Sequence, residues 1–147
     1  MLDNGDFSSG TDSWSLGFYE EALATGSVEN GVYITQITEG GMEPWNIQLV
    51  QTGITLEYGT EYRISFRARA DQERDLIVAV EQSADPWTEY FGDELILTTE
   101  MQTFTYDFYM THGTVNNARI AFNSGGSDIN WELEFVSLQV YRHDVGM

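Results

Sequence analysis

The stretch from Tyr62 to Ala70, YRISFRARA, alternates apolar and polar side chains along its whole length. Because successive side chains of a β-strand point to opposite faces, this alternation predicts a strand with one apolar face and one arginine-rich face. The same period of two recurs in residues 103–110 and 118–123. No stretch of the chain keeps the 3.6-residue period of an amphipathic helix, so the chain is expected to fold into sheets.

Turn-forming residues separate these segments, as in ENG, EGG, SADP and NSGGSD. With about eight to ten short strands, the sequence predicts an all-β fold, an antiparallel β-sandwich. Residues 17–24, GFYEEALA, could form a short helix by propensity, but the neighbouring segments favour another strand. Further strand candidates are residues 32–37, 46–51, 75–82, 94–99 and a last run within 131–141.

The chain of 147 residues predicts a single domain, residues 1–147, with room for a sizeable core. Its 24 acids against 6 bases give a formal net charge of −18. This charge argues against nucleic acid and anionic membranes as partners and leaves a neutral ligand or a cation open. A purely solubilising role for the charge is the alternative.

Cysteine is absent, which removes disulfides, zinc–thiolate sites and a cysteine nucleophile. No apolar run approaches the length of roughly 18 residues that a membrane-spanning helix needs. The start, MLDNGDF, lacks the basic and apolar regions of a signal peptide. We therefore expect the sequence to be a segment of a longer protein.

Three of the six bases, Arg63, Arg67 and Arg69, share one predicted strand face. Cross-strand ion pairing on a solvent-facing sheet is the favoured interpretation, because carboxylates are abundant. Contact with a ligand is the alternative.

Catalytic motifs of hydrolases, metalloproteases and P-loop proteins are missing from the sequence. The two histidines are His112, in a turn, and His143, near the end. Neither has sequence neighbours suited to base catalysis or metal ligation. A glycosidase needs one carboxylic acid with a raised pKa in an enclosed site. The acids here fall mostly in turns and on exposed strand faces, so the sequence favours a protein without enzymatic activity.

Several segments resemble the carbohydrate-binding modules of families 4 and 9. The opening LDNGDFSSGTDSW resembles the first strand of those modules, with its N-G-x-F-(E/S)-x-G-x-x-x-W signature. EPWNIQLVQ, LEYGTEYRISFRARA, ADPWTEYFG and the closing WELEFVSL follow in the order expected of the family. The resemblance extends from Leu2 to Tyr141, and the related families 16 and 22 share the architecture.

The resemblance implies a β-jelly-roll in which one concave sheet binds a single polysaccharide chain. The implied ligands are β-1,4- or β-1,3-glucan, mixed-linkage glucan, glucomannan or xylan. It also implies a secreted, extracellular and monomeric module attached to a glycoside hydrolase. The chemistry agrees, because aromatic rings cover the C–H faces of a sugar while amides and carboxylates bind its hydroxyls.

Two tryptophans are the main candidates for stacking on sugar. Trp45 matches the aromatic that walls the groove just before a strand, and Trp87 in the SADPW loop matches the opposite wall. The Pro44–Trp45 step favours an extended loop edge, although a core or turn-packing tryptophan is the alternative. Tyr90 is a weaker third candidate.

Alternate residues of the strand after Trp45 are expected to point to opposite faces of the sheet. Ile47 and Leu49 are expected in the core, while Asn46, Gln48 and Val50 face the other way. Gln48 could then bond a hydroxyl, or it could be an ordinary exposed strand residue. Candidates of the same kind at other strands are Gln82, Asn123 and Arg119.

Trp14 and Trp131 alternate with apolar neighbours on their strands and are expected in the core. Many modules of these families also hold a structural calcium that ties the first strand to the last. The positions that match it are Asp6, Ser8, Glu29, Val32 and Glu134, with Asp6 and Val32 offering backbone carbonyls. Ser8 stands where a carboxylate is common and Glu134 where Asp is usual, and a lost carboxylate weakens a calcium shell. A plain polar strand junction is the alternative.

The sequence thus favours non-catalytic binding of a polysaccharide chain that brings an attached hydrolase to its substrate. The rival hypothesis is a calcium-stabilised structural or adhesive β-sandwich of an extracellular protein.

Overall fold

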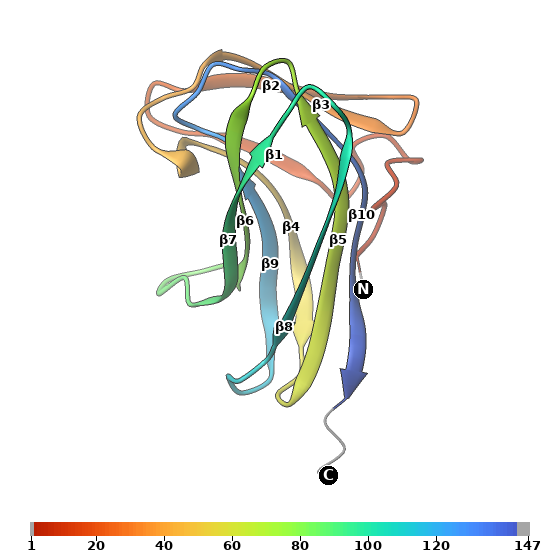
Figure 1. Ribbon diagram of the computed structural model, residues 1–147. Coiled ribbons are helices and arrows are strands. Elements are labelled where there is room, and N and C mark those ends of the chain that lie inside the picture. Colours follow the sequence, from red (N-terminus) through yellow and green to blue (C-terminus); the bar gives the residue numbers. More distant parts are fainter. Residues whose placement is uncertain (1, 144–147) are drawn as a thin grey trace.

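The computed structural model describes residues 2–143, with the backbone alone for His143, as ten β-strands and one short 3-10 turn (Figure 1). The strands and the turn, in chain order, are β1 (Ser15–Phe18), β2 (Leu23–Glu29), β3 (Val32–Glu39), η1 (Pro44–Asn46), β4 (Ile47–Leu56), β5 (Thr60–Ala70), β6 (Arg74–Gln82), β7 (Glu89–Leu97), β8 (Gln102–Tyr109), β9 (Val115–Asn123) and β10 (Trp131–His143).

The strands form two five-stranded antiparallel sheets. We call them the groove sheet, in the order β1-β4-β9-β6-β7, and the back sheet, in the order β2-β3-β10-β5-β8. Figure 1 shows β6 beside β7 on one side of the molecule and β10 alongside β5 on the other. The predicted all-β sandwich is confirmed. No helix among the described residues is long and apolar enough to cross a membrane.

The alternation in β5 translates directly into burial. Each of its apolar residues is buried and each intervening residue is partly exposed. The outward arginines pair with acids of neighbouring strands on the back sheet, which confirms the ion-pair interpretation. These contacts are Arg63 with Asp107 at 2.7 Å, Arg67 with Glu134 at 3.0 Å and Arg69 with Glu132 at 2.6 Å.

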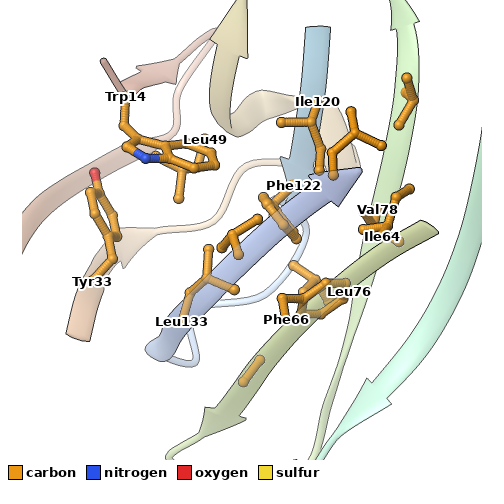
Figure 2. Packing of buried hydrophobic residues seen from close by; sticks show 14 of the residues in the cluster. Trp14, Tyr33, Leu49, Ile64, Phe66, Leu76, Val78, Ile120, Phe122 and Leu133 are labelled. Atoms are coloured by element: carbon orange, nitrogen blue, oxygen red, sulfur yellow. The ribbon is translucent and has the colours of Figure 1, made fainter. Parts of the chain in front are cut away.

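The core fills the space between the two sheets (Figure 2). Phe66 of the back sheet meets Phe122 of the groove sheet edge to face, with ring centroids 5.1 Å apart. Trp14 and Trp131 also contact Phe122 and are only 7% and 1% exposed. Both tryptophans therefore belong to the core, as the sequence predicted.

The opening segment differs from its prediction, because residues 2–14 form successive turns and the first strand begins at Ser15. Asn4 organises these turns. Its amide group donates to the carbonyls of Gly10 and Asp12 at 2.8 and 2.9 Å, and the Trp14 indole N–H donates to the Asn4 carbonyl at 3.0 Å. The N-G-x-F…W signature thus encodes a folded turn rather than a strand.

Residues 17–24 contain the end of β1, a turn and the start of β2, so this stretch is not a helix, but it is two strand ends joined by a turn rather than the expected single strand.

Candidate functional site

A groove of about 690 Å³ lies on the outer face of the groove sheet. In the sheet order β1-β4-β9-β6-β7, each strand or a loop next to it contributes lining residues, so the groove crosses the whole sheet. The lining residues are Tyr19, Pro44, Trp45, Gln48, Ile77, Ala79, Glu81, Trp87, Glu89, Arg119 and Asn123.

Strand parity decides which side chains reach the groove. In β9, Ile120 and Phe122 point into the core (Figure 2), so Arg119 and Asn123 point outward. In β6 the inward residues are Leu76, Val78 and Val80, which leaves Ile77, Ala79 and Glu81 on the groove side.

Short side chains lie in register across the outer face of the groove sheet. Strand pairing aligns one short residue from each of four adjacent strands: Val50, Ala121, Ala79 and Gly92. Longer side chains flank this row on both sides, with Gln48 and Asn123 on one side and Glu81 and Arg119 on the other. The register therefore creates a channel that runs across the strands.

Trp45 forms one wall and is 56% exposed. It lies in η1, where the Asn46 side-chain oxygen accepts from the amides of Met42 and Glu43 at 3.1 and 3.0 Å. Asn46 is therefore buried inside the turn and does not face outward with Gln48, as the parity argument expected. The strand starts one residue later than predicted, because Asn46 is the last residue of η1 and its side chain accepts a hydrogen bond from the amide of the N-cap residue Glu43.

A second loop supports the turn that carries Trp45. Gly125 donates its amide to the Pro44 carbonyl at 2.8 Å, and Ser124 donates to the Ile47 carbonyl at 2.9 Å. The approach is so close that a Cβ on Gly125 would lie 2.1 Å from the Glu43 carbonyl oxygen. Only glycine fits this position. The loop of Ser124 and Gly125 therefore packs directly against the turn that carries Trp45 and holds it in place.

Trp87 also lines the groove, and it is 49% exposed. It lies in the β6–β7 loop at φ 58° and donates its amide to the Ala84 carbonyl at 2.7 Å. The guanidinium of Arg119 lies against the indole ring, 4.9 Å from its centroid, a cation–π contact.

The floor is polar and internally paired. Gln48 donates through its amide nitrogen to the Asn123 oxygen at 2.9 Å. Arg119 donates two hydrogen bonds to one oxygen of Glu81, at 2.8 and 2.5 Å, and both side chains are largely buried. The remaining oxygens and amide hydrogens of these groups are available to sugar-like hydroxyls.

The structure also places lining residues that the sequence argument missed. Glu81 could have been found, because it shares the outward parity of Ile77 and Ala79. Tyr19 and Glu89 could not, because each depends on a glycine. A Cβ on Gly17 would lie 2.4 Å from the Tyr19 hydroxyl oxygen, and a Cβ on Gly92 would lie 2.3 Å from a Glu89 carboxylate oxygen. Because Gly17 and Gly92 have no side chains, the Tyr19 and Glu89 side chains can lie over the sheet at opposite edges of the groove.

Five of the seven predicted ligand residues line this one groove: Trp45, Trp87, Gln48, Asn123 and Arg119. The other two lie elsewhere. Tyr90 has no partner on β6, because the register shifts from Val80–Phe91 to Glu81–Glu89, and its ring packs edge-on against His112. Gln82 has the parity of Val80 and lines a separate hollow beside residues 114–117.

Three of the five calcium candidates, Glu29, Val32 and Glu134, meet at one junction of the back sheet, while Asp6 and Ser8 belong to the turns of residues 2–14. Glu29 pairs with Val32 across the β2–β3 turn, and Leu133 pairs with Tyr33, which puts Glu134 next to Val32. Asp6 is exposed, and its carboxylate accepts the Ser8 amide at 3.0 Å, which lowers the pKa of Asp6.

The fit of these residues to calcium is incomplete. The Glu134 carboxylate is held by Arg67 at 3.0 Å. No group of three or more acidic, histidine or cysteine side chains suited to a metal occurs in residues 2–143, whereas calcium takes six to eight oxygens.

Comparison with known proteins relates the sequence to a family and to a curated enzyme. The sequence matches a family described as a carbohydrate binding domain over residues 1–131. It is 25% identical over 105 residues to a cellulose 1,4-β-cellobiosidase of Acetivibrio thermocellus; the match covers 69% of this chain but only 12% of that enzyme.

Solved structures resemble the fold closely. A family 4 carbohydrate-binding module superposes with a TM-score of 0.90 at 27% identity, covering 95% of this chain and 99% of the module. The second N-terminal cellulose-binding domain of Cellulomonas fimi β-1,4-glucanase C superposes with a TM-score of 0.72 at 23% identity, over 92% and 90% of the two chains.

Proposed function

Since the chain belongs to the carbohydrate binding domain family of types 4 and 9, we propose that its groove binds a single β-linked polysaccharide chain and leaves it chemically intact. The ligand class is a β-1,4- or β-1,3-glucan, a glucomannan or a xylan. The similarity to a cellobiosidase supports a plant or microbial β-glycan as the ligand.

The observation that carries this proposal is the pair of half-exposed tryptophans, Trp45 and Trp87, on one groove. A pyranose presents apolar C–H faces and an equatorial belt of hydroxyls. An indole ring removes the C–H face from water, and the polar floor exchanges hydrogen bonds with the hydroxyls. Because the groove crosses several strands at an interstrand spacing of about 4.8 Å, it suits an extended chain of several sugars.

The polar floor favours binding over hydrolysis. A glycosidase needs one protonated and one ionised carboxyl group on either side of the bond that breaks. Glu81 is engaged by Arg119 through two hydrogen bonds. The neighbouring Glu89 is exposed to solvent. Neither residue has the enclosed, apolar setting of a general acid.

The module acts by proximity. Attached to a secreted glycoside hydrolase, it keeps the enzyme next to its polysaccharide, so that the catalytic encounter becomes effectively intramolecular. Affinity is modest, because every hydrogen bond to a sugar hydroxyl replaces one to water. One copy of the groove is sufficient for this role, so the module works as an extracellular monomer.

Affinity electrophoresis tests the proposal. The protein is run in native gels that contain hydroxyethylcellulose, barley β-glucan, laminarin, glucomannan or arabinoxylan, with a gel lacking polymer as reference. We expect retardation in at least one gel and no release of reducing sugar from any polymer. Unretarded migration in all five gels would overturn the binding function, and reducing sugar released by the purified protein would make it an enzyme.

A further inference from the structure

The rim of the groove carries exposed carboxylates. Five exposed acids lie within two residues of a lining residue: Glu20, Glu21, Glu43, Asp75 and Asp85. We refer to three of them, Glu20, Glu43 and Asp85, as the rim acids. Glu89, in the lining itself, adds a further exposed carboxylate. A ligand that enters the groove therefore passes several negative charges.

The arginines, all of which lie in the described part of the chain, each have a partner. The six basic residues are all arginines. Four of them form ion pairs on the back sheet, on the far side of the core from the groove: Arg63 with Asp107, Arg67 with Glu134, Arg69 with Glu132 and Arg142 with Glu61.

The other two arginines are equally committed. Arg74 is 5% exposed and donates to three backbone carbonyls. Arg119 lines the groove, but its charge is neutralised by Glu81. Among the residues that the structure describes, no arginine is left to bind a carboxylate in the groove.

We propose that the groove selects uncharged polysaccharide chains and rejects chains that carry carboxylates, such as uronic acids or carboxymethyl groups. This selectivity rests on the proposed binding function and names its ligand class more closely. Two like charges about 7–8 Å apart in water repel each other enough to lower affinity roughly two- to threefold. With the rim acids and Glu89 acting together, the loss reaches about tenfold at low salt. Because the Debye length falls from about 30 Å at 0.01 M to about 3 Å at 1 M salt, the loss shrinks as salt is added.

The test compares polymers that share a backbone. Hydroxyethylcellulose is paired with carboxymethylcellulose, laminarin with carboxymethylated β-1,3-glucan, and arabinoxylan with glucuronoxylan. Titration calorimetry at 10 mM and 500 mM NaCl measures each pair. For the backbone that binds, we expect the acidic polymer to bind at least about fivefold more weakly at 10 mM salt and within about twofold at 500 mM.

Two triple variants distinguish the effect of the rim acids on binding from the effect of the overall charge of the protein. The rim variant carries Glu20→Gln, Glu43→Gln and Asp85→Asn. The matched control carries Glu57→Gln, Glu73→Gln and Glu100→Gln, three exposed acids in the β4–β5, β5–β6 and β7–β8 connections, outside the groove lining. Both remove three charges. We expect only the rim variant to regain affinity for the acidic polymer, by about threefold or more at 10 mM salt.

The outcomes are distinct. Equal affinity for both members of a pair at low salt would overturn the selectivity and leave the binding function in place. Equal recovery in both triple variants would assign the effect to the net charge of −18 and overturn the role of the rim. Failure to bind every neutral polymer would overturn the proposed function and this inference with it.

Discussion

The guanidinium carbon of Arg119 lies 4.9 Å from the centroid of the Trp87 ring, while the same guanidinium donates two hydrogen bonds to Glu81. One arginine thus joins the floor of the groove to its wall. The contact restrains an indole that is otherwise half-exposed on a loop. A pre-positioned ring loses less conformational entropy when a sugar stacks on it.

Replacing Arg119 should therefore reduce both stability and binding. In Arg119→Met, Glu81 keeps a largely buried carboxylate without its partner, which costs about 2–3 kcal/mol of unfolding free energy. Trp87 loses its cation–π contact, and retention on polysaccharide weakens. The control is Arg63→Met, because its pair with Asp107 is exposed on the back sheet and is worth about 1 kcal/mol or less. Urea melts and affinity gels measure both effects; equal melts for the two variants would contradict this prediction.

Trp45→Ala should abolish retention and leave the fold intact. Covering about 100 Å² of apolar surface contributes roughly 2–3 kcal/mol to binding at ~25 cal/mol per Å². Loss of this contact brings a modest affinity below what a gel detects. The Trp45 side chain is half-exposed and its turn is held through backbone and Asn46 contacts, so the melting temperature should change little. Tyr58→Ala, another exposed aromatic outside the groove, is the control; a collapse in melting of Trp45→Ala would instead make Trp45 a structural residue.

The sequence was most informative where a property is local. Alternation along a strand placed Ile47 and Leu49 in the core and Gln48, Arg119 and Asn123 on the outer face. The same alternation gives Gln82 the parity of Val80 rather than that of Glu81, and Gln82 accordingly lines a separate hollow outside the groove.

Features that depend on partners far away in the sequence were out of reach. The bulge that removes Tyr90 from the groove is a property of β6–β7 pairing. The positions of Tyr19 and Glu89 depend on glycines beneath their side chains, and alternation within one strand does not report such packing. The turns of residues 2–14 follow from the hydrogen bonds of Asn4.

Arg74 should act on the groove from a distance. It donates to the carbonyls of Ser124 and Ile129 at 2.9 and 2.8 Å and so holds the loop that supports the Trp45 turn. A lysine cannot satisfy three carbonyls in fixed directions. We expect Arg74→Lys to cost about 2 kcal/mol of stability or more and to weaken polysaccharide binding in the wild-type background.

A double-mutant cycle shows whether this effect passes through Trp45. In a Trp45→Ala background, measured by calorimetry at high polymer concentration, Arg74→Lys should cost little further affinity. Gly125→Ala is a second variant that disturbs the same support from the other side, because its Cβ would meet the Glu43 carbonyl. Additive losses in the cycle would contradict a route through Trp45.

Calcium should stabilise the wild-type protein only weakly. Arg67 already supplies a positive charge to Glu134, at 3.0 Å, and a calcium ion would have to displace it. We expect the melting temperature with 2 mM calcium and with a chelator to differ by less than about 2 °C, since about 1 kcal/mol shifts the melting temperature of a domain this size by roughly 2–4 °C. Arg67→Met frees Glu134 and should enlarge the difference. A strong calcium response of the wild type would favour a structural ion and the adhesive-domain hypothesis.

Alkaline pH should destabilise the fold through Tyr33. Burial in the core raises the pKa of Tyr33 to about 12 from an ordinary value of 10.0. Because the folded state holds this proton more tightly than the unfolded state, the contribution is complete below pH 10 and is lost as the pH rises from 10 to 12. Two pKa units correspond to about 2–3 kcal/mol.

Tyr33→Phe removes the ionisable group and keeps most of the ring contact with Phe7, whose centroid lies 5.5 Å away. Urea melts at pH 8, 10, 11 and 12 should then show a shallower loss of unfolding free energy for the variant than for the wild type. Some dependence should remain, since burial and Asp93 also raise the pKa of Tyr106. Parallel pH profiles for the two proteins would show that the Tyr33 hydroxyl ionises without cost and that its surroundings are not the closed core described above.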